Sequence, residues 1–238
     1  MTQDRTSELA ANLEAVRRRI DAACRSAGRS PADVTLIVVT KTWPALDVRR
    51  LASLGVHDVG ENRGQEASVK AADTDDLDLR WHFVGQLQTN KAASVARYVD
   101  VVHSVDRLSL VQALDKGAAK AHRRLGCLVE VDLTDGGAGR GGVTPAEVTA
   151  LADQIAAAPH LDLLGVMGVA PLAREHQRDA SARAFGRLAE LSDQVRSGHP
   201  EAYLISAGMS DDLEEAVSAG ATHLRVGSAI LGSRASLG

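Results

Sequence analysis

The sequence lacks three features that would each point to a particular class of protein. It has only two cysteines, Cys24 and Cys127, which form no spaced metal motif and are too few for a disulfide framework. Its formal net charge is −4, which supplies no basic field for nucleic acid, and no run of lysines or arginines suggests an anionic membrane partner. No apolar stretch approaches the roughly 20 residues that cross a bilayer. These absences argue against a metal site, a nucleic-acid partner and a membrane partner, and they favour small molecules or proteins as ligands.

The chain also lacks an apolar signal region at residues 1–5, and with so few cysteines this favours the reducing cytoplasm. Its 238 residues, of which 45% are hydrophobic and 24% charged, are enough to bury a full core. No linker, low-complexity tract or long repeat divides the sequence. We therefore expect a single domain over residues 1–238.

Eight short apolar segments alternate with helical patterns along the chain. A helical pattern with one apolar face comes first, over residues 7–27, and Gly28 follows it as a stop. The predicted strands are 35–40, 58–60, 81–84, 101–104, 127–133, 163–169, 203–206 and 223–226. The helices predicted between them include 45–54, 108–124, 145–158, 180–196 and 211–219.

Eight strand-helix units in one domain predict an α/β fold, a (β/α)8 TIM barrel with an additional N-terminal helix. About 250 residues is the typical length of such a barrel. An open, doubly wound sheet is the alternative fold. If it bound a dinucleotide, it would usually carry a glycine fingerprint just after its first strand, where this chain has residues 41–44 without any glycine. The barrel is therefore the favoured fold.

A single lysine, Lys41, ends the apolar run 36–40. At the mouth of a buried strand, its ammonium is held out of bulk water or loses its proton, and either state suits imine chemistry. Lys41 is therefore a candidate Schiff-base lysine. The alternative is a lysine whose stem lies along apolar surface while its ammonium reaches solvent at the rim of the sheet.

The last two strands end in loops rich in glycine and serine, at residues 206–212 and 225–228. Barrels often hold a phosphate in these two loops, where glycines allow close backbone approach. Ser206 and Ser228 would add hydroxyl donors, whereas Ser210 is expected to cap the helix that follows it. The alternative is that the glycines of both loops serve only as turns.

A phosphate site opposite a strand-end lysine suits a ligand with a phosphate at one end and an aldehyde at the other. Pyridoxal 5'-phosphate (PLP) has this design. Arg225 would then face the pyridine nitrogen, and because a guanidinium does not readily give up a proton, the ring would be a weak electron sink. Alternatively, Arg225 is a structural ion-pair partner. A phosphosugar aldolase with a Schiff-base lysine and no cofactor would share the phosphate argument.

Six segments of the chain together resemble the pyridoxal phosphate homeostasis proteins. They span almost the whole chain in order, and the Trp-His-Phe and Gly-Met-Ser-Asp-Asp blocks are the most specific. The segments are Val39–Thr42, Gly60–Glu66, Trp81–Lys91, His103–Asp106, Gly208–Asp212 and Arg225–Ile230. The resemblance implies the fold of the alanine racemase N-terminal domain, with Lys41 carrying PLP as an internal aldimine.

The resemblance also implies binding roles for residues other than Lys41, and no metal ligand. Arg225 would lie at the pyridine nitrogen and Asn62 near the ring hydroxyl. The phosphate would be surrounded by Ser206, Gly227 and Ser228, in a loop shaped by the backbone of Gly208 and Met209.

The sequence departs from the family pattern at four positions. Trp43 stands where a second lysine is frequent, Gln86 where a histidine is usual, Ala207 where a methionine is common and Arg140 where a lysine is frequent. The loss of the second lysine puts in doubt any route that passes cofactor from Lys41 to a neighbouring amine. It leaves the aldimine itself intact.

The expected function is PLP binding in cofactor homeostasis, with little or no turnover. The related racemases append a β-domain that supplies a second acid–base group, and here only a short helix is expected after the last strand. This favours a monomer whose partners are PLP and PLP-dependent apo-enzymes. The competing hypothesis is a small PLP-dependent enzyme acting on amino acids, with Lys41 as base and His82 or Tyr203 as its partner.

Overall fold

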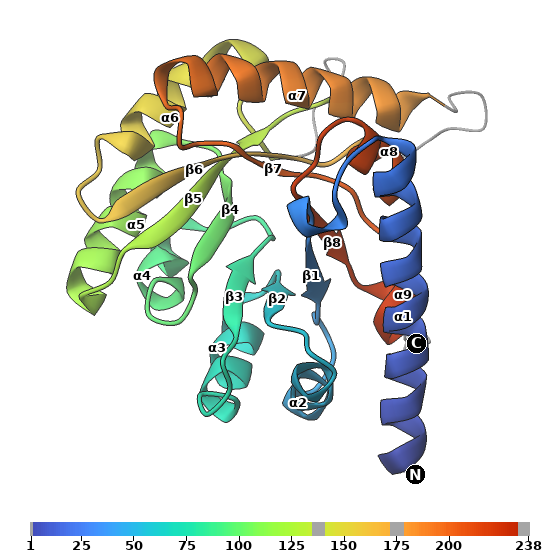
Figure 1. Ribbon diagram of the computed structural model, residues 1–238. Coiled ribbons are helices and arrows are strands. Elements are labelled where there is room, and N and C mark those ends of the chain that lie inside the picture. The colour runs from blue at the N-terminus through green and yellow to red at the C-terminus, as the bar shows by residue number, and fades with distance from the viewer. Residues whose placement is uncertain (1, 135–140, 172–178, 233–238) are drawn as a thin grey trace.

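The computed structural model describes residues 2–134, 141–171 and 179–232. Within these ranges, eight parallel strands form a closed barrel in which each strand pairs with the next and β8 pairs with β1 (Figure 1). The strands are β1 (Thr35–Val39), β2 (Asp58–Glu61), β3 (Arg80–Phe83), β4 (Val101–Val105), β5 (Leu125–Val131), β6 (Leu161–Gly168), β7 (Leu204–Ser206) and β8 (His223–Val226). The predicted barrel is confirmed.

Helices follow the strands and cover the outside of the barrel (Figure 1). The α-helices are α1 (Thr2–Ser26), α2 (Ala45–Ser53), α3 (Gly64–Asp73), α4 (Ala92–Val95), α5 (Leu108–Ala121), α6 (Val148–Ala156), α7 (Ala180–Gly198), α8 (Leu213–Ser218) and α9 (Ser228–Leu231). Short 3₁₀ turns are η1 (Pro31–Asp33), η2 (Thr89–Lys91) and η3 (Pro145–Glu147). None of the described helices is long and apolar enough to span a membrane.

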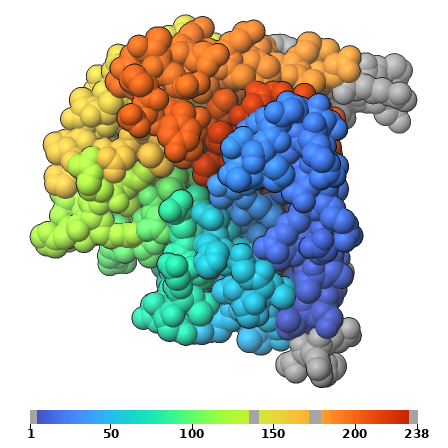
Figure 2. Space-filling model, in the orientation of Figure 1, coloured from blue at the N-terminus to red at the C-terminus, as the bar shows by residue number. Residues whose placement is uncertain are grey.

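Helix α1 lies outside the barrel and packs against α2, α8 and α9. Its apolar face, with Leu9, Leu13, Val16 and Ile20, is buried in the main core. In the space-filling view, this blue helix runs along the surface beside the red C-terminal elements (Figure 2). The additional N-terminal helix of the prediction is therefore present, and it joins the first and last parts of the barrel.

Helix α3 is not among the helices named in the sequence prediction. The buried side chains of α3 are Ala67, Lys70 and Ala71, and its large apolar residue, Val69, is exposed, so no helical period of large apolar residues marks its buried face. Several predicted boundaries also differ by one to three residues. For example, β5 begins at Leu125 and ends at Val131 instead of spanning 127–133, and α8 begins at Leu213 instead of residue 211.

Strands β6 and β7 approach closely at Gly165. This glycine has a φ of +149°, and a Cβ atom placed on it would lie 1.9 Å from the backbone oxygen of Leu204. Glycine is needed here both for its backbone angle and for the contact with β7. By contrast, a Cβ atom on Gly186 in α7 would meet no atom within 4 Å.

We therefore expect Gly165→Ala to push β7 away from β6 and to destabilise the fold by about 3 kcal/mol or more, as overpacking and backbone strain combine. The control Gly186→Ala should stabilise the protein by about 0.5–1 kcal/mol, since alanine favours a helix. Urea unfolding followed by circular dichroism measures both. Equal stability of the two variants would contradict the close approach.

Candidate functional site

Lys41 lies at the mouth formed by the C-terminal ends of the strands. It comes two residues after the last residue of β1, and its side chain is exposed. Val39 of β1 pairs with Gly60 of β2. Lys41 comes two residues after Val39 and Asn62 two residues after Gly60, so both residues follow their strands at the same level. No hydrogen bond or ion pair joins the Lys41 ammonium to another residue in the described ranges.

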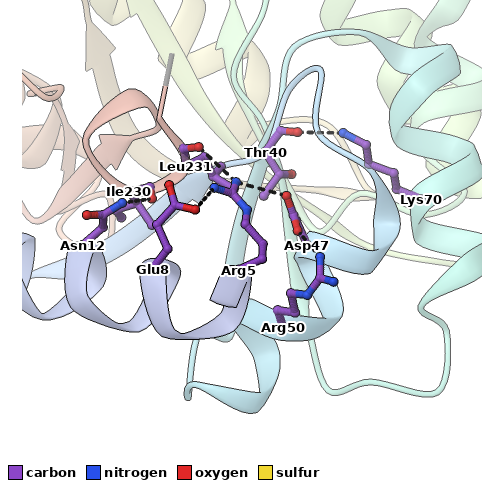
Figure 3. Close-up of polar contacts among 9 residues, drawn as sticks. All are labelled: Arg5, Glu8, Asn12, Thr40, Asp47, Arg50, Lys70, Ile230 and Leu231. Carbon is purple, nitrogen blue, oxygen red and sulfur yellow. Dashed lines mark hydrogen bonds and ion pairs between the residues drawn. The ribbon is translucent and has the colours of Figure 1, made fainter. Parts of the chain in front are cut away.

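A buried lysine supports the backbone next to Lys41. Lys70, from α3, is 5% exposed and donates hydrogen bonds to the backbone oxygen of Thr40 at 2.7 Å, to Glu61 Oε1 at 2.7 Å and to Glu66 Oε1 at 2.8 Å. Figure 3 shows its ammonium beside Thr40. One ammonium therefore serves two carboxylates and one carbonyl.

The same carboxylates hold the residues on either side of Lys41. The Thr40 hydroxyl donates to Glu61 Oε1 at 2.6 Å, and the backbone N–H of Thr42 donates to Glu66 Oε1 at 2.5 Å. Thr42 has a φ of +67°, which is uncommon for a residue with a branched side chain. The cluster of Glu61, Glu66 and Lys70, which we call the outer clamp, thus fixes the turn that carries Lys41.

Burial raises the pKa of Glu61 above its ordinary value, although the hydrogen bonds from Lys70 and Thr40 lower it. The second carboxylate oxygen of Glu61, Oε2, is buried and has no hydrogen-bond partner among the described residues. The ammonium of Lys70 is therefore the main group that offsets the free-energy cost of burying the Glu61 carboxylate. Without a counter-charge, that buried carboxylate would strongly destabilise the fold.

The loops after β7 and β8 meet beside β1. The Ser210 and Ser228 hydroxyls lie 3.1 Å apart, and the backbone N–H of Ala229 donates to Ser210 Oγ at 3.3 Å. A Cβ atom on Gly227 would lie 3.1 Å from the backbone oxygen of Val39, so the β8 loop passes close to the end of β1. The predicted lysine and the predicted phosphate loops therefore share one mouth.

The prediction that Ser210 caps the helix after it is wrong. Helix α8 begins at Leu213, its N-cap residue is Asp212, and no side chain caps it. The Asp212 carboxylate instead accepts a hydrogen bond from the backbone N–H of Met209 at 2.6 Å. The Ser210 hydroxyl is left to face Ser228, which makes Ser210 a binding candidate that the sequence analysis had treated only as a cap.

Gly208 and Met209 form the turn of the β7 loop. Gly208 has a φ of +88°, and its carbonyl accepts a hydrogen bond from the backbone N–H of Arg225 at 2.9 Å. A Cβ atom at Gly208 would lie 2.6 Å from the Cβ of Ala216. Met209 is partly exposed, at 38%. The glycine is thus required for the loop to fit between α8 and β8.

Arg225 and Ser206 lie inside the barrel, beneath the mouth. Arg225 is 5% exposed, and it donates to Ser206 Oγ at 2.6 Å and to the backbone oxygen of Gly168 at 3.0 Å. Burial lowers the pKa of Arg225 to about 10, so the guanidinium stays charged at neutral pH. Among the described residues, these two bonds use two of its five N–H donors. Ser206 is fully buried and holds Arg225 from below.

Asn62 carries an unused acceptor. Its Oδ1 atom is buried and has no hydrogen-bond partner in the described part of the chain. A Cβ atom on Gly85 would lie 2.5 to 2.7 Å from three atoms of Asn62, so the β3 loop packs directly on this residue. A buried acceptor of this kind could accept a hydrogen bond from a ligand hydroxyl, and the contact of Asn62 with a ring hydroxyl stays a prediction.

A carboxylate missed by the sequence analysis also faces the mouth. Glu130, on β5, lines a cavity of about 280 Å³ together with Gln86, Asp132 and Val169. Burial, and to a lesser extent the charges of Asp106 and Asp132, raise the pKa of Glu130 to about 7, against the opposing effect of Arg225. Its position within an alternating strand was the available signal, since every second residue of such a strand points into the barrel.

Trp43, which replaces the frequent second lysine, packs beside the N-terminal helix. The guanidinium of Arg5 lies 4.5 Å from the centre of a Trp43 ring. Arg5 also donates to Asp47 Oδ2 at 3.2 Å and to the backbone oxygen of Leu231 at 3.0 Å (Figure 3). This contact joins α1, α2 and α9 beside the Lys41 turn. Arg140, another departure from the family pattern, lies outside the described residues.

The two candidate acid–base partners of the enzyme hypothesis lie away from the mouth. His82 is 1% exposed within β3, and its two ring nitrogens contact His103 and Asp58, each at 2.9 Å. Tyr203 precedes β7, at the N-terminal end of the strand, and is 55% exposed. Neither side chain is placed to exchange a proton beside Lys41.

Replacing Lys70 tests the outer clamp. We expect Lys70→Met to lower the free energy of unfolding by about 3–5 kcal/mol at neutral pH, because Glu61 would lose its buried counter-charge. The loss should shrink as the pH falls, since a protonated carboxyl needs no ammonium. The control Lys116→Met changes an exposed lysine of α5, and urea unfolding of the two variants should differ clearly. Equal stability would show that the clamp contributes nothing.

Glu130 should make stability depend on pH. Its folded pKa of about 7 exceeds the unfolded value of about 4.3, so the carboxyl favours folding most at low pH. As the pH rises from about 4 to about 7, the wild type should lose roughly 3 kcal/mol relative to Glu130→Gln, and the difference should then level off. Urea unfolding across this range measures it. A constant difference between the two proteins would refute the raised pKa.

Known proteins share both the sequence pattern and the fold. The family described as alanine racemase, N-terminal domain, matches residues 11–235. The pyridoxal phosphate homeostasis protein of Mycobacterium tuberculosis is 43% identical over 97% of this chain and 95% of its own length. The protein of the same name from Escherichia coli is 34% identical over 96% of this chain and 97% of its own length.

Solved structures agree with this relationship. PipY of Synechococcus elongatus, determined with PLP bound, has a TM-score of 0.80 and 32% identity, covering 94% of this chain and all of its own. Alanine racemase of Corynebacterium glutamicum shares the fold at 16% identity, with a TM-score of 0.70 over 98% of this chain and 62% of its own. The chain therefore belongs to the alanine racemase N-terminal domain family and, within it, to the pyridoxal phosphate homeostasis proteins.

Proposed function

We propose that this protein binds PLP and acts in its homeostasis, holding the cofactor as an imine on Lys41 with little or no turnover. One observation carries the proposal. The pairing of β1 with β8 brings an exposed strand-end lysine next to the loop of Gly227, where the Ser210 and Ser228 hydroxyls face each other. A ligand with an aldehyde and a phosphate would meet complementary groups at both ends. PLP bound to PipY, which is similar over 94% of this chain, supports this choice of ligand.

The residues of the phosphate loops would bind the anion in two ways. Ser210 and Ser228 offer hydroxyl donors that now face each other and can turn toward a phosphate. Gly208 and Gly227 keep the backbone close to the barrel, so that the chain can approach a ligand without side chains in between. Because the Met209 N–H already bonds to Asp212, Met209 would act by shaping the loop.

Arg225 and Asn62 would orient the ring. Arg225 brings a charged donor group to the floor of the mouth, where it would hydrogen-bond the pyridine nitrogen and keep it unprotonated. Asn62 would accept a hydrogen bond from the ring hydroxyl through its unpartnered Oδ1. When bound, PLP supplies an aldehyde and an electron-withdrawing ring, and a ring paired with a guanidinium withdraws electrons weakly. Weak withdrawal favours a binding role over catalysis on amino acids.

The geometry also disfavours the enzyme hypothesis. Racemisation needs acid–base groups on both faces of the substrate carbon. His82 is engaged at both nitrogens inside the barrel and Tyr203 lies at the opposite end of its strand. The name shared by the relatives describes homeostasis. These observations favour a protein that passes PLP to apo-enzymes over one that turns over amino acids. We also propose that it is a cytoplasmic monomer.

The proposal is tested by incubating the purified protein with PLP and reducing it with borohydride. We expect a visible imine absorption that disappears on reduction, and a mass increase equal to one reduced PLP adduct. Lys41→Ala should show neither, while the control Lys91→Ala, which changes an exposed lysine of η2, should behave as the wild type. An adduct that persists in Lys41→Ala would place the imine elsewhere.

Turnover is measured on the same loaded protein. We expect racemisation or transamination of added amino acids to stay well below about 1 s⁻¹, the lower end of ordinary enzyme rates. A faster rate would contradict the homeostasis role and restore the enzyme hypothesis.

A further inference from the structure

A continuous chain of hydrogen bonds crosses the inside of the barrel. Arg225 Nη1 donates to Ser206 Oγ at 2.6 Å, and Ser206 Oγ lies 2.8 Å from His103 Nδ1. His103 Nε2 lies 2.9 Å from His82 Nδ1, and His82 Nε2 lies 2.9 Å from Asp58 Oδ1. The chain runs from β8 through β7, β4 and β3 to β2, and it begins beneath the mouth where Lys41 lies.

The far end of the chain lies at the opposite face of the barrel. Asp58 is the first residue of β2, and with His57, Asp78 and Arg80 it lines a cavity of about 380 Å³. The interior members are almost completely enclosed, since His82 is 1% exposed and Ser206 and His103 are 0% exposed. Water is therefore a poor competitor for these bonds, and each polar atom depends on its neighbour.

When both imidazoles are neutral, the two ends of the chain decide the direction of every bond between them. A guanidinium can only donate, and a carboxylate can only accept. His82 must donate from Nε2 to Asp58, so a neutral His82 has a bare Nδ1 that accepts from His103 Nε2. A neutral His103 then has a bare Nδ1, which accepts the hydroxyl proton of Ser206. The oxygen of Ser206 in turn accepts from Arg225.

The surroundings favour a neutral imidazole at His103. Burial, with smaller effects from His82, Arg225 and His223, holds the pKa of His103 well below its ordinary value. The pKa of Asp58 lies below its ordinary value, because the hydrogen bond from His82 and the charge of Arg80 oppose the effect of burial. His223 also faces this interior, but it contacts Thr222 Oγ1 at 2.9 Å, and burial lowers its pKa to about 4. It therefore adds no charge near neutral pH.

We propose that Asp58, His82 and His103 are positioning residues for the site at the mouth. Together with Ser206 and Arg225 they form a chain of hydrogen bonds that all point in one direction, which we call the relay. In the relay the Ser206 hydroxyl donates its proton to His103, and the Ser206 oxygen accepts a hydrogen bond from Arg225. Arg225 is thereby held with its remaining donors available above the relay. Asp58 sets this direction from the opposite face of the barrel, because it is the only one of the five that cannot donate.

The relay gives Ser206 a different role from a phosphate contact. Its hydroxyl proton goes to His103 and its oxygen accepts from Arg225, so a direct contact with phosphate would break one of these bonds. The consequence for PLP rests on the proposed function. A relay without a fixed direction would leave Arg225 less firmly placed and would weaken its contact with the ring nitrogen.

The direction of the relay is measured on the protein without PLP. Long-range ¹⁵N–¹H NMR spectra of protein labelled at histidine distinguish the two neutral tautomers and the imidazolium. At pH 8, above the ordinary pKa of histidine near 6.5, we expect His82 and His103 both to carry their proton on Nε2. Variants His82→Gln and His103→Gln assign the signals, since glutamine can both donate and accept in either place. A proton on Nδ1 of either residue, or a charged His82, would overturn the assignment.

The role of Asp58 is measured through PLP affinity. Asparagine at position 58 can donate as well as accept, so Asp58→Asn should leave the fold intact but remove the fixed direction. We expect the tautomers to become mixed and the affinity for PLP to fall about 3- to 10-fold, the range that one hydrogen bond commonly contributes. The matched control Asp78→Asn removes a carboxylate from the same cavity but outside the relay, and it should change neither quantity.

The two measurements separate this inference from the proposed function. Mixed tautomers in Asp58→Asn with an unchanged affinity for PLP would refute the positioning role. A wild type with both Nε2–H tautomers that takes up no PLP would refute the proposed function while leaving the relay in place. Equal losses of affinity in Asp58→Asn and Asp78→Asn would show that only the charge of the cavity matters, which would also overturn the proposal.

Discussion

The pairing of β1 with β8 is the constraint on which the candidate site depends. Its register aligns Ile37 with Arg225 and Val38 with Val226, so the residues after both strands emerge at the same level. Lys41 and Ser228 are far apart in the sequence, and in an open doubly wound sheet nothing would require the ends of the first and last strands to be adjacent. Closure of the barrel makes them neighbours, and the close contact of Gly227 with Val39 keeps the two loops together.

Two buried polar systems support this mouth from different sides of the barrel wall. The outer clamp lies between the strands and α3, where Lys70 holds the turn that carries Lys41. The relay lies inside the barrel, where Ser206 holds Arg225. Buried polar groups are costly unless they are paired, so both systems tolerate few arrangements. The mouth thus gains a rigid lysine turn on one side and a rigid guanidinium on the other.

Local sequence patterns revealed the parts of the structure that are determined locally. The apolar run before Lys41 predicted β1, and the glycines and serines of residues 206–212 predicted the loop after β7. Helix α3 was not named in the prediction, and its buried face consists of alanines and Lys70. The roles of Ser210 and Glu130 depend on residues from other strands. The spacing of residues within one segment does not show which residues of other segments will lie beside them in the fold. His82 and His103 likewise gain their roles only when β3 and β4 are paired.

Helix α1 has a consequence for the synthesis of the protein. It leaves the ribosome long before α8 and α9, on which it packs, and Arg5 bonds to Leu231, 226 residues later. At about 5–20 residues per second, roughly 10 to 45 seconds separate the emergence of the two. Throughout that time the apolar face of α1 lacks its partners α8 and α9. The nascent chain therefore carries an incompletely covered amphipathic helix until the barrel is nearly complete, which makes α1 a natural early binding site for chaperones.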